Sequence, residues 1–315
     1  MTKTVYLEIV PRAPFDFAGT ARSHGWCVLP PNRWDPGAST LHRVQRLSSG
    51  AVVLLRIVGK GSVESPRIAI HVDHAGDLSP HERYEVAHVA AHMLRLEEDL
   101  SAFYALCEER GPPWLDFPRG LGRLLRSPTL FEDALKTICT TNIQWRGTMR
   151  MVSGLVSALG APFPDDPTWR AFPTPEAVAA APEATLSESI RLGYRSPYVH
   201  GLAKRMASGE FDLESLKDSD LPTSELKREL LSIKGVGAYA AATLLMLLGR
   251  YDEIAVDTEF RQFVSSKYFS GQRVPDAEAV AVYDCWGRWK YLAYWYDRWR
   301  SPLVARKTPS SPPSA

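Results

Sequence analysis

The sequence predicts an α+β protein in which a small N-terminal antiparallel β-sheet precedes an all-helical body. Polar and apolar residues alternate in several short segments near the N-terminus, which is the period of strands with one buried face. Too few residues separate these segments for helical crossovers, so hairpins and an antiparallel sheet are favoured. From Ser79 onward, apolar residues recur every three or four positions, which indicates helices.

The expected strands all lie before Ser79. They cover residues 4–10, 41–47, 51–58 and 68–72. Ser48-Ser49-Gly50 is typical of a turn, and residues 59–66 are expected to form a loop.

Helix-start signals place the helices that follow. Ser79-Pro80 begins one helix, and Ser127-Pro128 begins another that ends in the polar elbow Thr140-Thr141-Asn142. Further helices are expected over residues 198–206, 224–233, 239–248 and 276–299.

Length and composition are those of an ordinary globular protein. The chain has 315 residues, of which 45% are hydrophobic and 23% charged, so two or three domains with a substantial core are expected. We expect a sheet plus a helix over 1–110, a helical part over 111–300, and a disordered, proline-rich tail over 301–315. A net charge of +1 lacks the strong positive balance of non-specific nucleic-acid binders, so any DNA contact must be local.

No stretch is long and apolar enough to cross a bilayer, and the first ten residues lack the apolar block of a secretory signal. The protein is therefore expected in the cytoplasm, associated with the nucleoid if it is bacterial, as a monomer without membrane contact. Cysteines without Cys-x-x-Cys spacing argue against a zinc site or an iron-sulfur cluster. Buried thiols are expected at Cys27, Cys107, Cys139 and Cys285.

The most informative segment spans residues 224–260. A helical stripe of leucines and Ile233 precedes the run Lys234-Gly235-Val236-Gly237, and an apolar helix begins at Tyr239. The two glycines permit a sharp turn, and the free amides at the start of the second helix can hold a DNA phosphate. The pattern predicts a helix, a hairpin and a helix that contact DNA through Lys234, Gly235, Val236 and Gly237.

The same glycines also match the dinucleotide-binding pattern Gly-x-Gly-x-x-Ala, with Asp257 at a suitable distance. That pattern requires a buried strand immediately before its first glycine. Residues 225–231 are instead charged and rich in helix-forming side chains at helical spacing. We therefore favour the helical hairpin.

The run 230–241, the buried helix after it, and Ile254-Ala255-Val256-Asp257 closely resemble the helix-hairpin-helix (HhH-GPD) DNA glycosylase superfamily. The resemblance covers roughly residues 127–299 and implies an HhH-GPD glycosylase body that acts on damaged double-stranded DNA. Residues 193–199 look like the segment before the hairpin in the 8-oxoguanine branch. Residues 131–160 and the tryptophan-rich segment 286–293 are similar to the 3-methyladenine branch.

The resemblance implies that Asp257 is the catalytic carboxylate. An anion near the sugar stabilises an oxocarbenium-like transition state and can also activate a water molecule. An alternative role is that Asp257 only caps the helix beginning at Thr258, and the two roles are compatible. Tyr239 stands where strand-cleaving members carry a nucleophilic lysine, so an enzyme that leaves the abasic strand uncut is expected.

The resemblance also assigns residues that meet the DNA. Asn142 matches the position from which the family fills the gap left by a flipped base, and its alternative is an ordinary polar loop residue. Tyr239 and Trp299 are expected to line the base pocket, while simple packing remains open for Tyr239. The other C-terminal aromatic residues are expected mostly in the core.

The hairpin of this family also implies a structural Na⁺ or K⁺ held by main-chain carbonyls. The corresponding residues here are Leu231, Ile233 and Val236. No catalytic metal and no organic cofactor are implied.

Taken together, these features predict a monofunctional DNA glycosylase of base excision repair that hydrolyses the N-glycosidic bond of alkylated purines of the 3-methyladenine type. Aromatic walls suit electron-poor, cationic purines. An 8-oxoguanine or mismatch glycosylase of the same superfamily, and a non-catalytic DNA-binding protein, remain alternatives.

Overall fold

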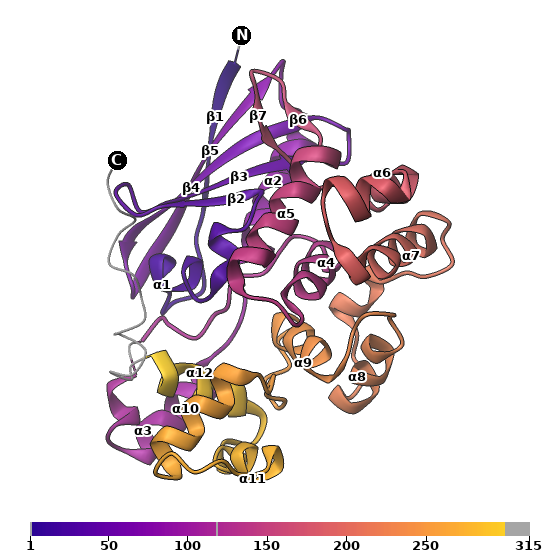
Figure 1. Cartoon of the computed structure of the whole chain (residues 1–315). Helices are drawn as coiled ribbons and strands as arrows, with labels where there is room; N and C mark the ends of the chain where they lie inside the picture. Colours follow the sequence, from indigo (N-terminus) through magenta and orange to yellow (C-terminus); the bar gives the residue numbers. More distant parts are fainter. Residues whose placement is uncertain (1, 118, 300–315) are drawn as a thin grey trace, which may run out of the picture. The chain divides into compact units, whose positions relative to one another are not determined.

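The computed structural model describes residues 2–117 and 119–299 (Figure 1). The tail expected over 301–315 lies outside these residues. Contacts divide the chain into a first unit, Met1–Ser219 with Ile233–Gly235, and a second unit, Asp220–Ser232 with Val236–Ala315. The division into domains 1–110 and 111–300 stays a prediction, and the helices that precede Ser219 are in the first unit together with the sheet.

The first unit contains an antiparallel five-stranded sheet in the order β1-β5-β4-β3-β2. Its strands are β1 (Thr2–Ile9), β2 (Asn32–Asp35), β3 (Thr40–Arg46), β4 (Val52–Ser62) and β5 (Ser65–Ala75). The predicted antiparallel sheet is confirmed. β2 escaped the sequence analysis because its four residues are too few to show an alternating pattern.

The loop expected over residues 59–66 is wrong, because β4 and β5 continue to a tight turn between Ser62 and Ser65. Gly59 lies within β4 rather than in a turn. A Cβ atom there would lie 2.5 Å from Cβ of Phe17, so the glycine permits close packing of α1 (Phe17–Ala21) on the strand.

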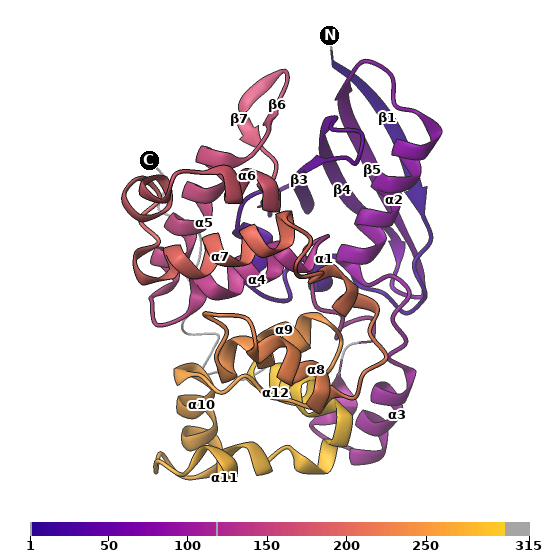
Figure 2. The ribbon, with the colours of Figure 1, turned by 90° about the vertical axis from the view of Figure 1, so that its right-hand side faces the viewer.

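Helix α2 (Pro80–Leu94) packs on the sheet, as Figure 2 shows. Its start is confirmed: Ser79 and Glu82 form a reciprocal capping box. The other helices of this unit are α3 (Ser101–Arg110), α4 (Leu130–Thr140), α5 (Trp145–Leu159), α6 (Pro175–Ala180) and α7 (Ser196–Ala207). Short helical turns cover Gly25–Val28, Trp114–Asp116, Thr185–Ser189, Gly193–Arg195 and Glu214–Asp218.

The body of the chain is largely helical, but it also contains a small hairpin of β6 (Pro162–Phe163) and β7 (Asp166–Arg170). Phe163 and Ala171 form a buried cluster with Val44 of β3. The burial of these apolar side chains explains why a hairpin stands between two helices at this point.

A buried charge network joins β3 to α4. The Glu132 carboxylate accepts from Arg43 Nη2 at 2.7 Å and from Lys136 Nζ at 2.6 Å. All three side chains are almost completely buried. Burial alone would raise the pKa of Glu132, but the charges of Arg43 and Lys136 outweigh burial and lower it to about 2.

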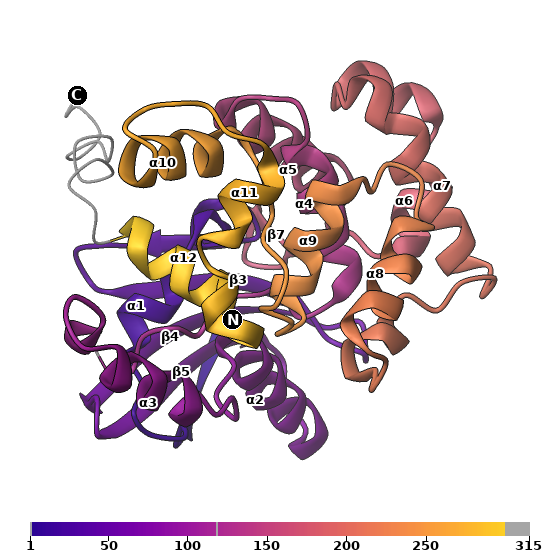
Figure 3. The same cartoon turned by 90° about the horizontal axis from the view of Figure 1, so that it is seen from below.

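The second unit consists of α8 (Thr223–Leu231), α9 (Ala238–Leu247), α10 (Thr258–Tyr268), α11 (Asp276–Ala281) and α12 (Lys290–Trp299), labelled in Figure 3. The single helix expected over 276–299 is wrong. A 3₁₀ turn, Asp284–Trp289, interrupts it, and Gly287 has a left-handed φ of 53°. This break allows both Trp286 and Trp289 to be buried. Among the described residues, no helix is long and apolar enough to cross a membrane.

A buried carboxylate also organises the second unit. Asp297 of α12 accepts hydrogen bonds from Tyr268 at 2.6 Å and Tyr283 at 2.9 Å, and Lys267 of α10 forms an ion pair with it. These bonds fix α12 against α10.

We predict that Glu132→Gln lowers the free energy of unfolding by about 3–5 kcal/mol, because two buried cations lose their carboxylate. Urea unfolding at pH 7 measures the loss, and Glu109→Gln, an exposed change on α3, serves as the control. Since folding lowers the pKa of Glu132 from 4.5 to about 2, the wild-type advantage is present above pH 4.5 and disappears as the pH falls toward 2. Equal stability of the two variants at pH 7 would contradict this account.

Candidate active site and nucleic-acid interface

The predicted hairpin between two helices is confirmed. The turn between α8 and α9 has its left-handed residue at Gly235, with a φ of +92°. A Cβ atom at Gly235 would lie 2.8 Å from the ring of Tyr198, so both backbone and space require glycine here. Gly237 has an ordinary φ of −93°, and no heavy atom lies within 4 Å of the position a Cβ would take.

Gly237 is the N-cap residue of α9, and no side chain caps this helix start. A side chain at position 237 would therefore meet no atom of the described protein, so the space beside this helix start is open. Lys234 is exposed, Val236 is buried, and Ile233 is buried. Leu231 is 42% exposed. Coordination of a cation by the main-chain carbonyls of Leu231, Ile233 and Val236 stays a prediction.

Asp257 is the N-cap residue of α10. Its Oδ1 accepts a hydrogen bond from the main-chain N–H of Phe260 at 2.6 Å. The capping role is confirmed, and it uses one of the two carboxylate oxygens. A main-chain hydrogen bond from Glu259 also lowers the pKa of this carboxyl.

Burial raises the pKa of Asp257, while the Phe260 amide and the positive charge of Arg298 oppose that shift. The carboxylate in turn acts on Tyr291 and Tyr294. Burial is the largest cause that raises the pKa values of both phenols, and the negative charge of Asp257 adds to it. Tyr239 likewise raises the pKa of Tyr291. A half-buried carboxylate therefore lies among neutral phenols, with one guanidinium nearby.

The two residues expected to line the base pocket, Tyr239 and Trp299, differ in their exposure and in their neighbours. Tyr239 is half-buried at the start of α9 and interacts electrostatically with Tyr291. Trp299 is 54% exposed, and its ring stacks on Trp295 with centroids 6.2 Å apart. The ring contacts of Trp299 thus lie along α12 itself.

Sequence analysis missed Arg298 as a neighbour of Asp257. It follows Tyr294 by one helical turn, so the spacing was available, but nothing in the sequence placed α12 beside the start of α10. Arg298 Nη2 also lies 3.3 Å from Oε2 of Glu259, the second residue of α10.

The elbow that carries Asn142 has an unusual backbone. Asn142 is exposed and has a left-handed φ of 48°. Its side-chain amide donates to the hydroxyl of Tyr194 at 3.3 Å, and Thr141 Oγ1 lies 3.4 Å from the same hydroxyl. In this structure the amide is therefore held by a partner within the protein.

Arg195 braces the same elbow from inside. Its guanidinium is buried and donates to the carbonyls of Ile138, Leu192 and Thr141. It also lies 4.4 Å from the ring centroid of Tyr194. The sequence gives no local signal for this role of Arg195, because its three carbonyl partners come from two separate segments.

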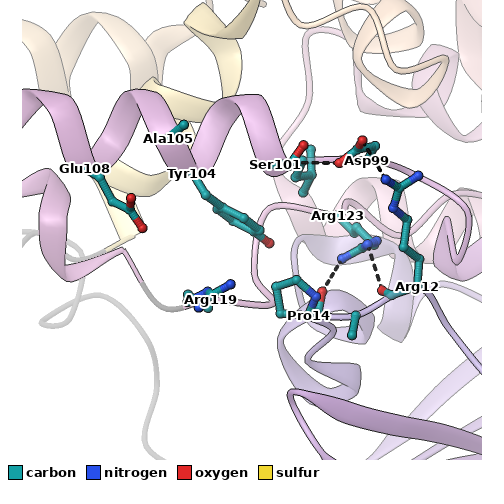
Figure 4. Close-up of a pocket in the computed structure, with 11 residues that line it drawn as sticks. Arg12, Pro14, Asp99, Ser101, Tyr104, Ala105, Glu108, Arg119 and Arg123 are labelled. Atoms are coloured by element: carbon teal, nitrogen blue, oxygen red, sulfur yellow. Dashed lines mark hydrogen bonds and ion pairs between the residues drawn. The ribbon is translucent and has the colours of Figure 1, made fainter.

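Figure 4 shows a cavity of about 220 Å³ beside α3, lined by residues that include Arg12, Asp99, Tyr104 and Arg119. Arg123 closes one side, where its guanidinium donates to main-chain carbonyls. None of the residues predicted for catalysis or DNA binding lines this cavity.

Three of the expected buried thiols, Cys27, Cys107 and Cys139, are confirmed. The expected burial of Cys285 is wrong: Cys285 is exposed in the 3₁₀ turn that interrupts the expected C-terminal helix. Within residues 2–117 and 119–299, no three His, Cys, Asp or Glu side chains lie together as metal ligands would.

The model of the HhH-GPD superfamily of base excision DNA repair proteins matches residues 135–287. The DNA-3-methyladenine glycosylase of Bacillus subtilis (strain 168) is 27% identical over 179 residues. That match covers 54% of this chain and 56% of the relative, so the chain spans little more than half the length of this curated protein.

Solved structures share the whole fold. The 3-methyladenine DNA-glycosylase from Archaeoglobus fulgidus has a TM-score of 0.72 at 22% identity, covering 94% of this chain and 99% of that one. The Clostridium acetobutylicum 8-oxoguanine glycosylase/lyase bound to double-stranded DNA has a TM-score of 0.64 at 19% identity, covering 95% and 97%. MBOgg1 with a low-affinity DNA ligand has a TM-score of 0.66 at 19% identity, covering 96% and 100%.

We predict that Asp257→Ala lowers the free energy of unfolding by about 1 kcal/mol, because α10 loses its cap, whereas Asp257→Asn preserves it. Urea unfolding of both variants measures the difference. Since burial raises the pKa of Asp257, wild type should lose stability relative to Asp257→Asn as the pH rises through that pKa. Equal losses in the two variants would show that the cap contributes nothing.

Proposed function

Because the chain belongs to the HhH-GPD superfamily of base excision DNA repair glycosylases, we propose that it releases alkylated purines of the 3-methyladenine type from damaged duplex DNA without cutting the strand. The observation that carries this proposal is the half-buried carboxylate of Asp257, held at the start of α10 among neutral phenols. Membership of the superfamily supports the proposed class of reaction, and the surroundings of Asp257 support the proposed mechanism.

In the proposed reaction the bond between the base and C1′ breaks, and both bonding electrons leave with the base. Positive charge then develops on the sugar, where the Asp257 carboxylate stabilises it electrostatically. Partial burial strengthens this attraction because less water screens it. A water molecule adds to C1′, and its proton passes to the carboxylate or to the departing base.

The hydrogen bond from Phe260 fixes the direction of this carboxylate before substrate arrives. Such preorganisation means that no reorientation is needed as charge develops. Capping and catalysis are therefore proposed as two uses of one side chain, with one oxygen for each.

Strand cleavage by the same enzyme would need an amine to attack C1′ and form a Schiff base. At the start of α9 the residue is Tyr239, whose phenol cannot form one. We therefore propose an abasic strand as the product. Tyr239, Tyr291 and Tyr294 form the walls of the base pocket in this proposal, with Trp299 at its rim.

Cationic alkylated purines leave readily because their glycosidic bond is already weakened, and aromatic walls attract them. The name of the Bacillus subtilis relative agrees with such substrates. An 8-oxoguanine or mismatch substrate is the second candidate, favoured by the asparagine at the elbow and its Tyr194 partner. A neutral lesion would also tolerate the guanidinium of Arg298 beside Asp257 better than a cationic base would.

For DNA binding we propose that the amides around Gly235, Val236 and Gly237 hold a backbone phosphate, with Lys234 adding a positive charge. Asn142 is proposed to fill the gap left by the extruded base. Carbonyls of the 231–236 segment are neutral oxygen donors, which suits the proposed Na⁺ or K⁺ rather than a transition metal.

We predict that wild type releases 3-methyladenine or 7-methylguanine from an alkylated duplex in single turnover, and that strand scission requires subsequent alkali. Asp257→Asn, which retains the cap, should slow release by at least about 100-fold. Parallel duplexes with 8-oxoguanine, hypoxanthine, uracil or a mismatch test the second candidate. Scission without alkali would refute the argument from Tyr239, and no release from any duplex would refute the proposed function.

We also predict the pH dependence of release. Because burial raises the pKa of Asp257 above 3.8, the rate should increase with pH along a limb that lies above the range of an ordinary aspartate. Arg298→Gln removes a positive neighbour and should move this limb to higher pH. Arg273→Gln, an exposed change in the same unit, is the control. An unmoved limb in Arg298→Gln would show that Arg298 does not act on the carboxylate.

A further inference from the structure

Helix α5 exposes two arginines, Arg146 and Arg150, one helical turn apart. They lie on the side of the helix opposite its buried face, which consists of Thr148, Met151, Val152, Leu155 and Val156. Neither guanidinium makes a hydrogen bond or an ion pair with any residue in the described part of the chain. Both charges are therefore available to a partner.

Several other arginines of the first unit are neutralised by carboxylates. Arg12 pairs with Asp99 at 2.8 Å, Arg56 pairs with Asp73 at 2.8 Å, and Arg205 pairs with Glu210 at 2.8 Å. In a chain of net charge +1, unpaired neighbouring cations make a local positive surface.

Helix stability does not explain this placement. Arg146 lies in the first turn of α5, which contains no acidic residue. The helix dipole disfavours a cation at that end by a few tenths of a kcal/mol. The charge at Arg146 thus costs the isolated protein stability.

Next to these arginines the surface is apolar and aromatic. Ile143 is 36% exposed and Trp145 is 39% exposed, immediately after Asn142. The Trp145 ring packs on Gly25, where a Cβ atom would lie 2.4 Å from the ring. Glycine at position 25 therefore lets the outer edge of the ring come close to the backbone, while part of the side chain faces solvent.

We propose that Trp145, Arg146 and Arg150 form a second DNA contact at the elbow, in which the arginines bind phosphates of one strand and Trp145 stacks on an adjacent base. Residues four apart rise about 6 Å along a helix, and a B-DNA strand carries a phosphate about every 3.4 Å of its axis. Two long side chains at this spacing reach phosphates of a single strand. This contact rests on the proposed function for its ligand, and it lies outside the hairpin that the superfamily shares.

The chemistry of the contact sets its selectivity. Guanidinium-phosphate bonds carry no sequence information, and stacking on an aromatic face tolerates every base. The contact therefore adds affinity at the elbow without selecting the base against which Trp145 stacks.

The test is the salt dependence of binding to an undamaged duplex and to a duplex with a neutral abasic analogue. Each lost phosphate contact should reduce the slope of log K against log salt by about 0.9, so R146Q and R150Q together reduce it by about 1.8. W145A should weaken binding about five-fold or more without changing this slope, because stacking is uncharged. R46Q, an exposed arginine on β3, is the matched control, and thermal unfolding checks that each variant is folded.

These experiments distinguish a failure of the proposed DNA contact from a failure of the proposed function. If wild type releases no base but R146Q and R150Q still lower the salt slope relative to R46Q, the surface stands and the proposed function falls. If base release occurs but the double variant keeps the wild-type slope, the arginines serve a partner other than DNA and the inference is overturned. A wild-type affinity in W145A would remove the stacking contact from the proposal.

Discussion

The first unit depends on one buried carboxylate. Glu132 near the start of α4 holds Arg43 of β3 and Lys136 of the next helical turn, and all three would be costly to bury without one another. The pairing fixes α4 against the sheet. Since α4 ends at Thr140, the same pairing determines where the elbow begins, and Arg195 then fixes the elbow through the carbonyls of Ile138 and Thr141.

The second unit repeats this design with a different carboxylate. Asp297 accepts hydrogen bonds from two tyrosine hydroxyls and pairs with a lysine, and it thereby holds α12 against α10. Asp257 is the N-cap residue of α10. Arg298, the next residue, then lies close enough to act on the Asp257 carboxylate. In both units a buried carboxylate holds neighbouring elements together, and groups that we propose to contact substrate lie beside it, exposed or half-buried.

Local signals predicted much of this molecule. The capping box at Ser79, the glycines of the hairpin, and Asp257 as an N-cap are short-range features, so their outcome followed from neighbouring residues. Features that depend on distant packing could not be predicted. The helical break at Gly287 accompanies the burial of Trp286 and Trp289, and Cys285 is exposed in the same 3₁₀ turn. Tyr194, Arg195 and Arg298 each contact or act on residues far away in sequence, which no local pattern reveals.

In the proposed reaction the Asp257 carboxylate stabilises positive charge on the sugar. The most direct measurement compares the affinity of wild type and Asp257→Asn for two abasic duplexes, one with a cationic pyrrolidine and one with a neutral tetrahydrofuran. Wild type should bind the cationic analogue at least about ten-fold more tightly, and this preference should disappear in Asp257→Asn. Equal affinities of wild type for the two analogues would contradict it.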